Sequence, residues 1–197
     1  MAGTDPQEGV VPFNRPSIAE AEMAAVTEVL AGRYMAGDGD FTARARMALE
    51  RHYPDSSVLL TTSGTAALEM AALLLDLSPG DEVIVPSFTF SSTASAFALA
   101  GGRLVFADID PHTWCLDPAS AASSITDRTR AIVTVHYGGV PGNLGALAAV
   151  AADAGVDLIE DAAHGLFGSL DGTPLGSSGR FGILSFHETK NVTSGEG

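Results

Sequence analysis

The sequence predicts an α/β layer fold built on buried parallel strands. Short apolar runs of four to six residues alternate along the chain with longer, alanine-rich segments of helical periodicity. The runs are apolar at consecutive positions and not at every second one, which is typical of strands buried on both faces of a parallel sheet. Residues 17–197 contain no Pro/Gly-rich linker, so we expect one domain preceded by a polar leader, residues 1–16.

Two helices are expected before the first strand. Ser17 stands three residues before Glu20, which is the spacing of a capping box, and apolar side chains then recur at helical intervals as far as Gly32. Residues 37–39 read Gly-Asp-Gly and predict a loop, because glycine favours turns. Residues 41–52 then predict a second helix.

Six strands and four more helices are expected after these two. The strands are residues 58–61, 81–86, 103–106, 131–135, 156–159 and 181–186, and the helices are residues 66–75, 92–99, 117–125 and 144–154. Asp117 followed by Pro118 is a favourable N-cap and first-turn pair for the third of these helices. In open α/β sheets ligands bind beyond the carboxyl ends of the strands, so the residues that follow each strand are the candidates for a site.

Composition excludes several classes of function. The 24 acidic residues outnumber 10 basic ones for a formal charge of −14, and no basic cluster exists that could bind nucleic acid or an anionic membrane. Cys115 is the single cysteine, so no internal disulfide can form. The chain has no apolar run of ~18 residues, no signal-peptide pattern and no metal-ligand spacing. We therefore expect a cytoplasmic protein that holds no metal.

Two strand ends have side chains that suit a ligand. Ser63-Gly64-Thr65-Ala66 lies between a strand and a helix, where the first N–H groups of the helix and the Thr65 hydroxyl would form an anion pocket or simply cap the helix. Asp161, after the run 156–159, would hold a protonated heterocyclic nitrogen or serve as an N-cap. His164 lies three residues further on and has either a ligand-binding or a structural role.

Lys190 is the only lysine, since the other nine basic residues are arginines. It follows the last predicted strand within Ser185-Phe186-His187-Glu188-Thr189-Lys190-Asn191. A lysine among apolar and aromatic neighbours has its pKa lowered by desolvation and becomes a nucleophile that forms Schiff bases, which arginine cannot do. A solvated surface position is the alternative interpretation.

The order of these motifs resembles the DegT/DnrJ/StrS family of sugar-nucleotide aminotransferases. The resemblance covers residues 11–197 and rests on SGT (63–65), PSFTF (86–90), EDAAH (160–164), SFHETKN (185–191) and GEG (195–197). Members of the family are pyridoxal-phosphate (PLP) enzymes, and the sequence is most similar to the dTDP-4-amino-4,6-dideoxygalactose transaminases among them. The resemblance implies a three-layer α-β-α, aspartate-aminotransferase-like (fold type I) large domain over residues 17–197. It also implies that this domain is truncated and that the C-terminal small domain is absent.

The resemblance also assigns roles to residues. Lys190 would form the internal aldimine with PLP and later move a proton, and Asp161 would pair with the pyridinium nitrogen so that the ring acts as an electron sink. The remaining cofactor-binding residues would be Gly64, Thr65, Ala66 and Ser185 at the phosphate, Phe90 on the ring face and His164 near the ring hydroxyl.

The activity implied is transfer of an amino group from glutamate to a 4-keto-6-deoxyhexose nucleotide by a homodimeric enzyme. Two alternatives stay open: an aminotransferase of another keto-sugar, a keto-cyclitol or an aromatic precursor, and a non-catalytic remnant or partner subunit. In the family the chain continues past Gly-Glu-Gly into an interior strand, which would pair the first and the last predicted strands. We therefore expect the 197 residues alone to be poorly stable and inactive.

Overall fold

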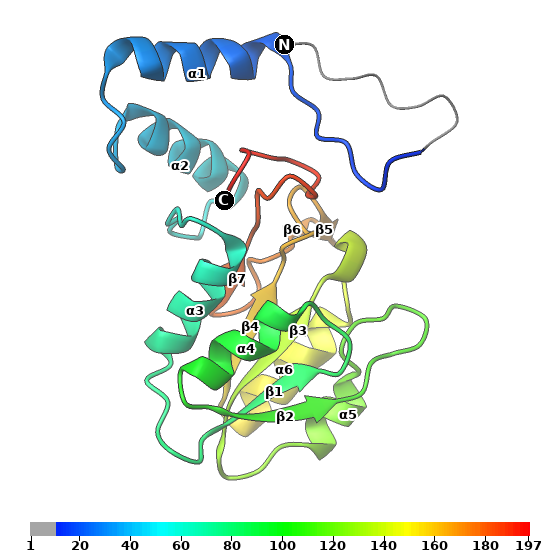
Figure 1. The fold of residues 1–197 in the computed structure, drawn as a ribbon. Coiled ribbons are helices and arrows are strands. Elements are labelled where there is room, and N and C mark those ends of the chain that lie inside the picture. Colours follow the sequence, from blue (N-terminus) through cyan, green and yellow to red (C-terminus); the bar gives the residue numbers. More distant parts are fainter. Residues whose placement is uncertain (1–10) are drawn as a thin grey trace.

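Five of the apolar runs pair as parallel strands in the computed structural model, which describes residues 11–197 (Figure 1). The sheet has the order β2-β1-β3-β4-β7. Its strands are β1 (Glu82–Pro86), β2 (Arg103–Ala107), β3 (Thr129–Val135), β4 (Asp157–Asp161) and β7 (Phe181–Ile183). A separate two-stranded hairpin joins β5 (Ser169–Leu170) to β6 (Thr173–Pro174). All neighbouring pairs in the main sheet are parallel, as expected from consecutive apolar positions.

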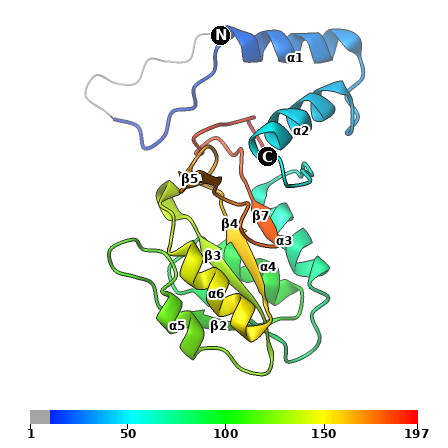
Figure 2. The same ribbon diagram turned by 180° about the vertical axis from the view of Figure 1, so that it is seen from behind.

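Helices cover both faces of this sheet and complete a three-layer α-β-α fold (Figures 1 and 2). One face packs against α3 (Gly64–Leu74) and α4 (Ser91–Leu99), and the other against α5 (Pro118–Ser123) and α6 (Leu144–Ala154). Successive strand residues point to opposite faces, so Ala131 and Val133 join the first core whereas Ile132 joins the second. The predicted fold class is confirmed.

Two further helices lie beside these layers. These are α1 (Glu20–Gly32) and α2 (Asp40–His52), and neither contains a buried residue. Tyr53, directly after α2, is buried, and its hydroxyl donates a hydrogen bond to the carbonyl of Leu175 at 3.2 Å. A short 3-10 turn, η1 (Tyr137–Gly139), follows β3. No helix within residues 11–197 is both long enough and apolar enough to cross a membrane.

The predicted start of the first helix is wrong by two residues. The helix begins at Glu20 with Ala19 as its N-cap, because the Glu22 carboxylate accepts the backbone N–H of Ala19 at 2.8 Å. Ser17 therefore lies outside the helix and does not cap it. Residues 1–10 of the predicted leader lie outside the described residues. The predicted cap at Asp117 is confirmed, since its carboxylate accepts the N–H of Ala119 at 3.1 Å.

Two strand predictions also need correction. Residues 58–61 do not form a strand, because no neighbouring strand within residues 11–197 pairs with them. The last strand ends at Ile183 and not at residue 186, because its ladder partner β4 ends at Asp161, opposite Ile183. Residues 58–61 and the free edge of β7 line the same groove, which has a volume of about 520 Å³.

A fully buried ion pair fixes β7 and its preceding loop to the centre of the sheet. His136 Nε2 and Glu160 Oε2 lie 2.8 Å apart, and both side chains are inaccessible to solvent. The Glu160 carboxylate also accepts the backbone N–H groups of Gly176, Ser178 and Gly179 at 3.0, 2.6 and 2.7 Å. Burial alone would raise the pKa of Glu160, but the hydrogen bonds from His136 and the backbone outweigh it and leave this pKa below its ordinary value.

We predict that Glu160→Gln loses about 3–5 kcal/mol of unfolding free energy, the usual cost of breaking a buried pair. Because the folded-state pKa is lowered, the stability contributed by Glu160 is present above the pKa of the unfolded chain and is lost as pH falls through the folded pKa. Urea unfolding at several pH values, with exposed Glu69→Gln as the control, measures both effects. An acid-side pH dependence as steep in Glu160→Gln as in the parent protein would contradict the prediction.

Candidate active site

Asp161 ends β4 and points toward the face covered by α3 and α4. Its side chain is held at both oxygens, since Oδ2 accepts the Thr93 hydroxyl at 2.6 Å and Oδ1 accepts the N–H of Ala163 at 3.1 Å. Asp161 is only 4% exposed and Thr93 is fully buried. These two hydrogen bonds fix the orientation of the carboxylate beside the site.

His164 presents a hydrogen-bond donor to this region. Its Nδ1 accepts the backbone N–H of Gly138 at 3.0 Å, so the proton of the neutral ring must be on Nε2. Burial lowers the pKa of His164, and the positive charge of Lys190 lowers it further, whereas Asp161 opposes the shift. The ring is therefore neutral at physiological pH and offers Nε2–H to a ligand.

Lys190 follows β7 and lies within electrostatic range of both Asp161 and His164. Its backbone N–H closes a turn on the carbonyl of His187 at 2.9 Å, and the next side chain, Asn191, donates to the carbonyl of Leu166 at 2.6 Å. Burial lowers the pKa of the Lys190 ammonium and Asp161 raises it by less. A partly buried amine with a lowered pKa is a competent nucleophile.

The start of α3 has unpaired backbone donors at the place where the sequence indicated an anion pocket or a helix cap. A Cβ on Gly64 would lie 3.1 Å from Cβ of Ser185 and 3.3 Å from the carbonyl oxygen of Leu184, so only glycine allows the helix to approach β7 this closely. Within residues 11–197 the N–H groups of Gly64 and Thr65 have no hydrogen-bond acceptor. These two N–H groups are available to an anion at the positive end of the helix, whereas the nearby Ser185 hydroxyl donates to the carbonyl of Gly197 at 3.3 Å.

Two other groups that were predicted to bind a phosphate already have hydrogen-bond partners in the protein. The N–H of Ala66 donates to the Ser63 hydroxyl at 3.1 Å, which makes Ser63 the N-cap of α3. The Thr65 hydroxyl is 2.8 Å from that of Ser92, in the first turn of α4. The backbone N–H groups of Gly64 and Thr65 are therefore the free donors of this pocket.

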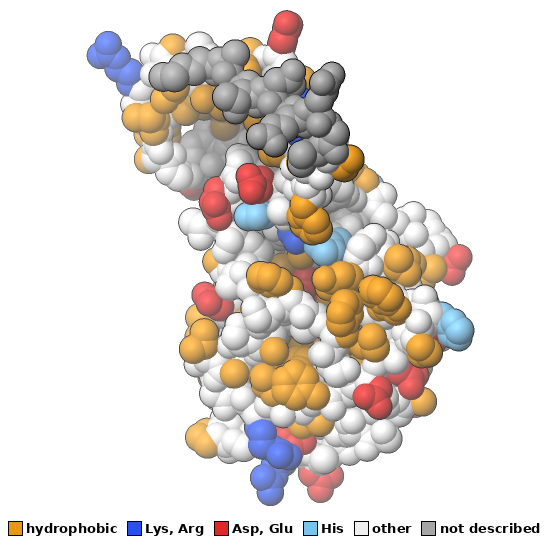
Figure 3. Space-filling view, turned by 45° about the vertical axis from the view of Figure 1, so that its right-hand side comes forward, with side chains coloured by type: hydrophobic (Ala, Val, Ile, Leu, Met, Phe, Trp, Pro, Cys, Tyr) orange, Lys and Arg blue, Asp and Glu red, His pale blue; other side chains and the backbone are white. Residues whose placement is uncertain are grey.

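Aromatic rings extend outward from His164. Its ring centroid is 5.4 Å from that of Tyr137, Tyr137 is 4.7 Å from Phe88, and Phe88 is 5.5 Å from Trp114. Figure 3 shows hydrophobic side chains gathered beside histidines on this face of the molecule. Phe90, at the start of α4, is 70% exposed and has a free ring face.

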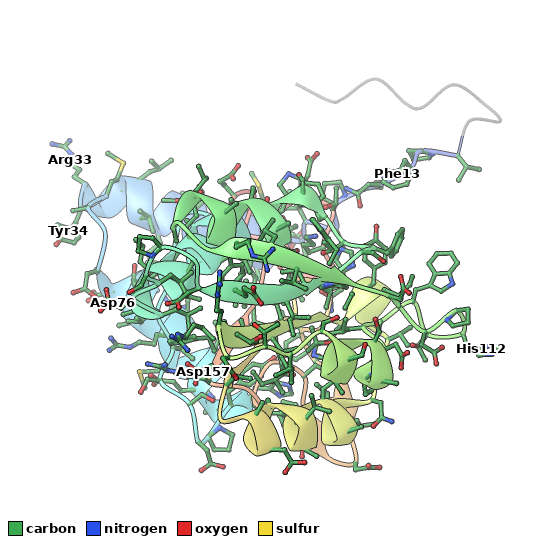
Figure 4. The ribbon with its side chains drawn as sticks, turned by 90° about the horizontal axis from the view of Figure 1, so that it is seen from below. Phe13, Arg33, Tyr34, Asp76, His112 and Asp157 are labelled. Carbon is green, nitrogen blue, oxygen red and sulfur yellow. The ribbon has the colours of Figure 1, made fainter. Side chains whose placement is uncertain are left out.

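Trp114 is 56% exposed and has a φ of 60°, a left-handed conformation that bulky residues rarely adopt. Its backbone N–H donates to the carbonyl of Asp110 at 2.8 Å, and the Asp110 carboxylate accepts the N–H groups of His112 and Thr113 at 2.7 and 3.0 Å. His112 itself projects away from the sheet (Figure 4). The loop therefore holds the indole in an exposed position beside Phe88.

From the sequence, no functional role was predicted for Thr93, and Thr89 was named only as part of the PSFTF segment. Thr93 is in the first turn of α4, and Thr89 lies just before Phe90, the N-cap of that helix. No local pattern links either residue to Asp161, so the sequence holds no signal that would have found them. Their hydroxyl oxygens lie 2.7 Å apart, so Thr89 is joined through Thr93 to Asp161.

Residues 16–197 match the sequence model of the DegT/DnrJ/EryC1/StrS aminotransferase family. Among solved structures, the aminotransferase TlmJ from Streptoalloteichus hindustanus is 36% identical with a TM-score of 0.91, covering 95% of this chain and 52% of its own. DesI, determined in the presence of its TDP-sugar product, is 34% identical with a TM-score of 0.81, and the match covers 93% of this chain and 46% of the DesI chain. NtdA from Bacillus subtilis, determined with its bound cofactor PMP, is 32% identical with a TM-score of 0.80, and the match covers 90% of this chain and 40% of the NtdA chain. The chain spans about half the length of such relatives.

We predict that Lys190 reacts with trinitrobenzenesulfonate with a pH midpoint below that of an ordinary lysine, because burial favours the neutral amine. Asp161→Asn removes the charge that raises this pKa and should shift the midpoint further down. Peptide mapping separates Lys190 from the α-amine, since no other lysine exists. Asp153→Asn, an exposed carboxylate on α6, is the control. A midpoint that Asp161→Asn leaves in place would contradict the proximity of the two charges.

Proposed function

The chain belongs to the DegT/DnrJ/EryC1/StrS aminotransferase family, and from that premise we propose that the whole protein is a PLP-dependent aminotransferase that acts on a keto-sugar. The observation that supports this most directly is the convergence of Asp161, His164 and Lys190 at the carboxyl ends of β4 and β7. These are a fixed anion, a neutral hydrogen-bond donor and a partly buried primary amine. Together they suit a charged heterocycle that bears a carbonyl group.

The described residues fit PLP group by group. Asp161 would hold the protonated ring nitrogen, Nε2–H of His164 would donate to the ring hydroxyl, and Phe90 would cover a ring face. The N–H groups of Gly64 and Thr65, next to Ala66, would bind the phosphate, and the Ser185 hydroxyl would join them by turning away from the carbonyl of Gly197. PLP supplies an aldehyde that condenses with primary amines and a ring that accepts electrons. The PMP bound in NtdA supports this assignment.

Lys190 has two roles in this proposal. Its neutral amine, which burial favours, attaches the cofactor to the protein, and after release Nζ moves a proton between C4′ of the cofactor and the carbon that bears the amino group. Asp161 would accept a hydrogen bond from the protonated ring nitrogen, because its buried carboxylate is held in one orientation by two hydrogen bonds. Partial burial of the amine limits the access of water to it.

For the substrates we propose glutamate as amino donor and a dTDP-linked 4-keto-6-deoxyhexose as acceptor. DesI, which was determined with its TDP-sugar product, supports an acceptor of this class. The ring series from His164 to Trp114 offers flat apolar surfaces to a hexose and a base. A keto-cyclitol or another keto-sugar would use the same cofactor residues, so the acceptor needs its own test.

We also propose that the whole protein is a homodimer, as the family resemblance implies. Apolar side chains in and just before α1 support this, because each is more than half exposed. They are Ile18, Met23, Val26 and Leu30. Sedimentation velocity of the protein checks the proposal, and a monomer at micromolar concentration would overturn it.

We predict that the PLP-loaded protein converts glutamate to one equivalent of 2-oxoglutarate per site and changes its absorption spectrum as the cofactor takes up the amino group. Lys190→Arg keeps the positive charge but cannot move the proton, so the rate should fall by about 10²–10⁴-fold. Arg180→Lys, an exposed change of the same kind, is the control. A cofactor-loaded protein that never forms 2-oxoglutarate would support the non-catalytic alternative instead.

Trp114 is the only tryptophan among these 197 residues, so its fluorescence reports on the outer end of the aromatic series. We predict that dTDP-sugars quench this fluorescence with saturation, whereas the free deoxyhexose and inositol do not, because stacking of a base changes the environment of the exposed indole. Titration of the PLP-loaded protein measures the effect. Quenching by the cyclitol and not by dTDP compounds would contradict the proposed dTDP-sugar acceptor and favour a keto-cyclitol instead.

A further inference from the structure

We propose that Thr93 is a positioning residue that holds the Asp161 carboxylate in place for the cofactor, with Thr89 fixing the direction of the Thr93 hydroxyl. The inference rests on the proposed function, because it concerns the partner of the cofactor's ring nitrogen. It adds a residue that contacts neither substrate nor cofactor and acts through Asp161.

The hydrogen-bond directions follow from chemistry. An ionised carboxylate only accepts hydrogen bonds, so Thr93 must donate its single hydroxyl proton to Oδ2 of Asp161, 2.6 Å away. The contact of 2.7 Å between the two threonine hydroxyls then requires Thr89 to be the donor. A one-way series therefore runs from Thr89 through Thr93 to Asp161, and its last bond is of the charge-assisted kind.

This series of hydrogen bonds restricts the orientation of the Asp161 carboxylate. Thr93 is fully buried and lies on α4, which packs against α3 and the sheet. Its hydroxyl is held in place from two sides, by Oδ2 of Asp161 and by the hydroxyl of Thr89. With Oδ2 bound to Thr93 and Oδ1 bound to the N–H of Ala163, the carboxylate cannot rotate without losing a hydrogen bond. The lone pairs left over are free to accept a ring N–H.

The neighbouring residue ties the same turn of α4 to the anion pocket. Ser92 contacts the Thr65 hydroxyl at 2.8 Å, and Thr65 is in the first turn of α3. Two consecutive residues, Ser92 and Thr93, therefore link α4 to the proposed phosphate end and to the proposed ring-nitrogen end of the cofactor site. Loss of the Thr93 hydroxyl would free Asp161 while the phosphate end stays fixed.

Thr93→Val is the decisive variant, because it keeps shape and removes the hydroxyl. Thr134→Val is its matched control, since the Thr134 hydroxyl is also fully buried but has no hydrogen-bond partner within the described residues. For each variant we would measure the dissociation constant of PLP, the pH titration of the bound cofactor's absorption, and kcat and KM for the amino donor. Thr93→Ser tests rescue by a hydroxyl that lacks the methyl group.

The expected result is that Thr93→Val weakens PLP binding about tenfold, shifts the pH midpoint of the cofactor spectrum and lowers kcat more than it changes KM. Thr93→Ser should recover most of the binding, Thr89→Val should show a smaller loss, and Thr134→Val should bind PLP as the parent protein does. Thr93→Val with the parent's PLP affinity and spectrum, or Thr93→Ser as defective as Thr93→Val, would overturn the inference. Failure of the parent protein itself to bind PLP would overturn the proposed function and the inference with it.

Discussion

Burial of two consecutive carboxylates at the end of β4 is the constraint on which the rest of the structure depends. Because strand residues alternate between faces, Glu160 points toward α5 and α6 and Asp161 toward α3 and α4. A buried charge is costly unless it is hydrogen-bonded, so each carboxylate requires its own set of donors. Glu160 is hydrogen-bonded to His136 and to backbone N–H groups of the loop before β7. Asp161 accepts hydrogen bonds from Thr93 and from the turn after β4. The backbone N–H of His136 also donates to the carbonyl of Asp161 at 3.0 Å, which locks the ends of β3 and β4 together. One carboxylate therefore anchors the segment that leads to Lys190, and the other faces that lysine.

The proposed chemistry likewise depends on a small number of charged groups. In a chain of net charge −14, the site gathers one amine, one carboxylate and one neutral imidazole, and the phosphate site that we propose relies on backbone N–H groups in place of cations. Partial burial keeps the pKa of Lys190 low, which favours its neutral, nucleophilic form. An arginine at this position could supply charge but no nucleophile, so the retention of one lysine is explained by the reaction we propose.

The sequence predicted the interior strands well, because consecutive apolar residues buried on both faces are a local signal of a parallel sheet. It failed at residues 58–61 and 184–186, because a strand exists only where a neighbour pairs with it, and an apolar run contains no information about that neighbour. Ser17 was misjudged because Ala19 is the N-cap, and the carboxylate of Glu22, three residues after Ala19, accepts its backbone N–H. Asp161, His164 and Lys190 were foreseeable because the carboxyl ends of parallel strands meet at one edge. Thr93 was not, because its partner lies 68 residues away in the sequence.

The central claim is that the amine of Lys190 holds PLP. Reduction of the PLP-loaded protein with borohydride, followed by proteolysis and mass spectrometry, tests it most directly, because the chain offers only Lys190 and the α-amine as primary amines. The account predicts a pyridoxyl group on the peptide that contains Lys190, and its complete loss in Lys190→Arg. A pyridoxyl group found only at the α-amine, or none at all, would contradict it.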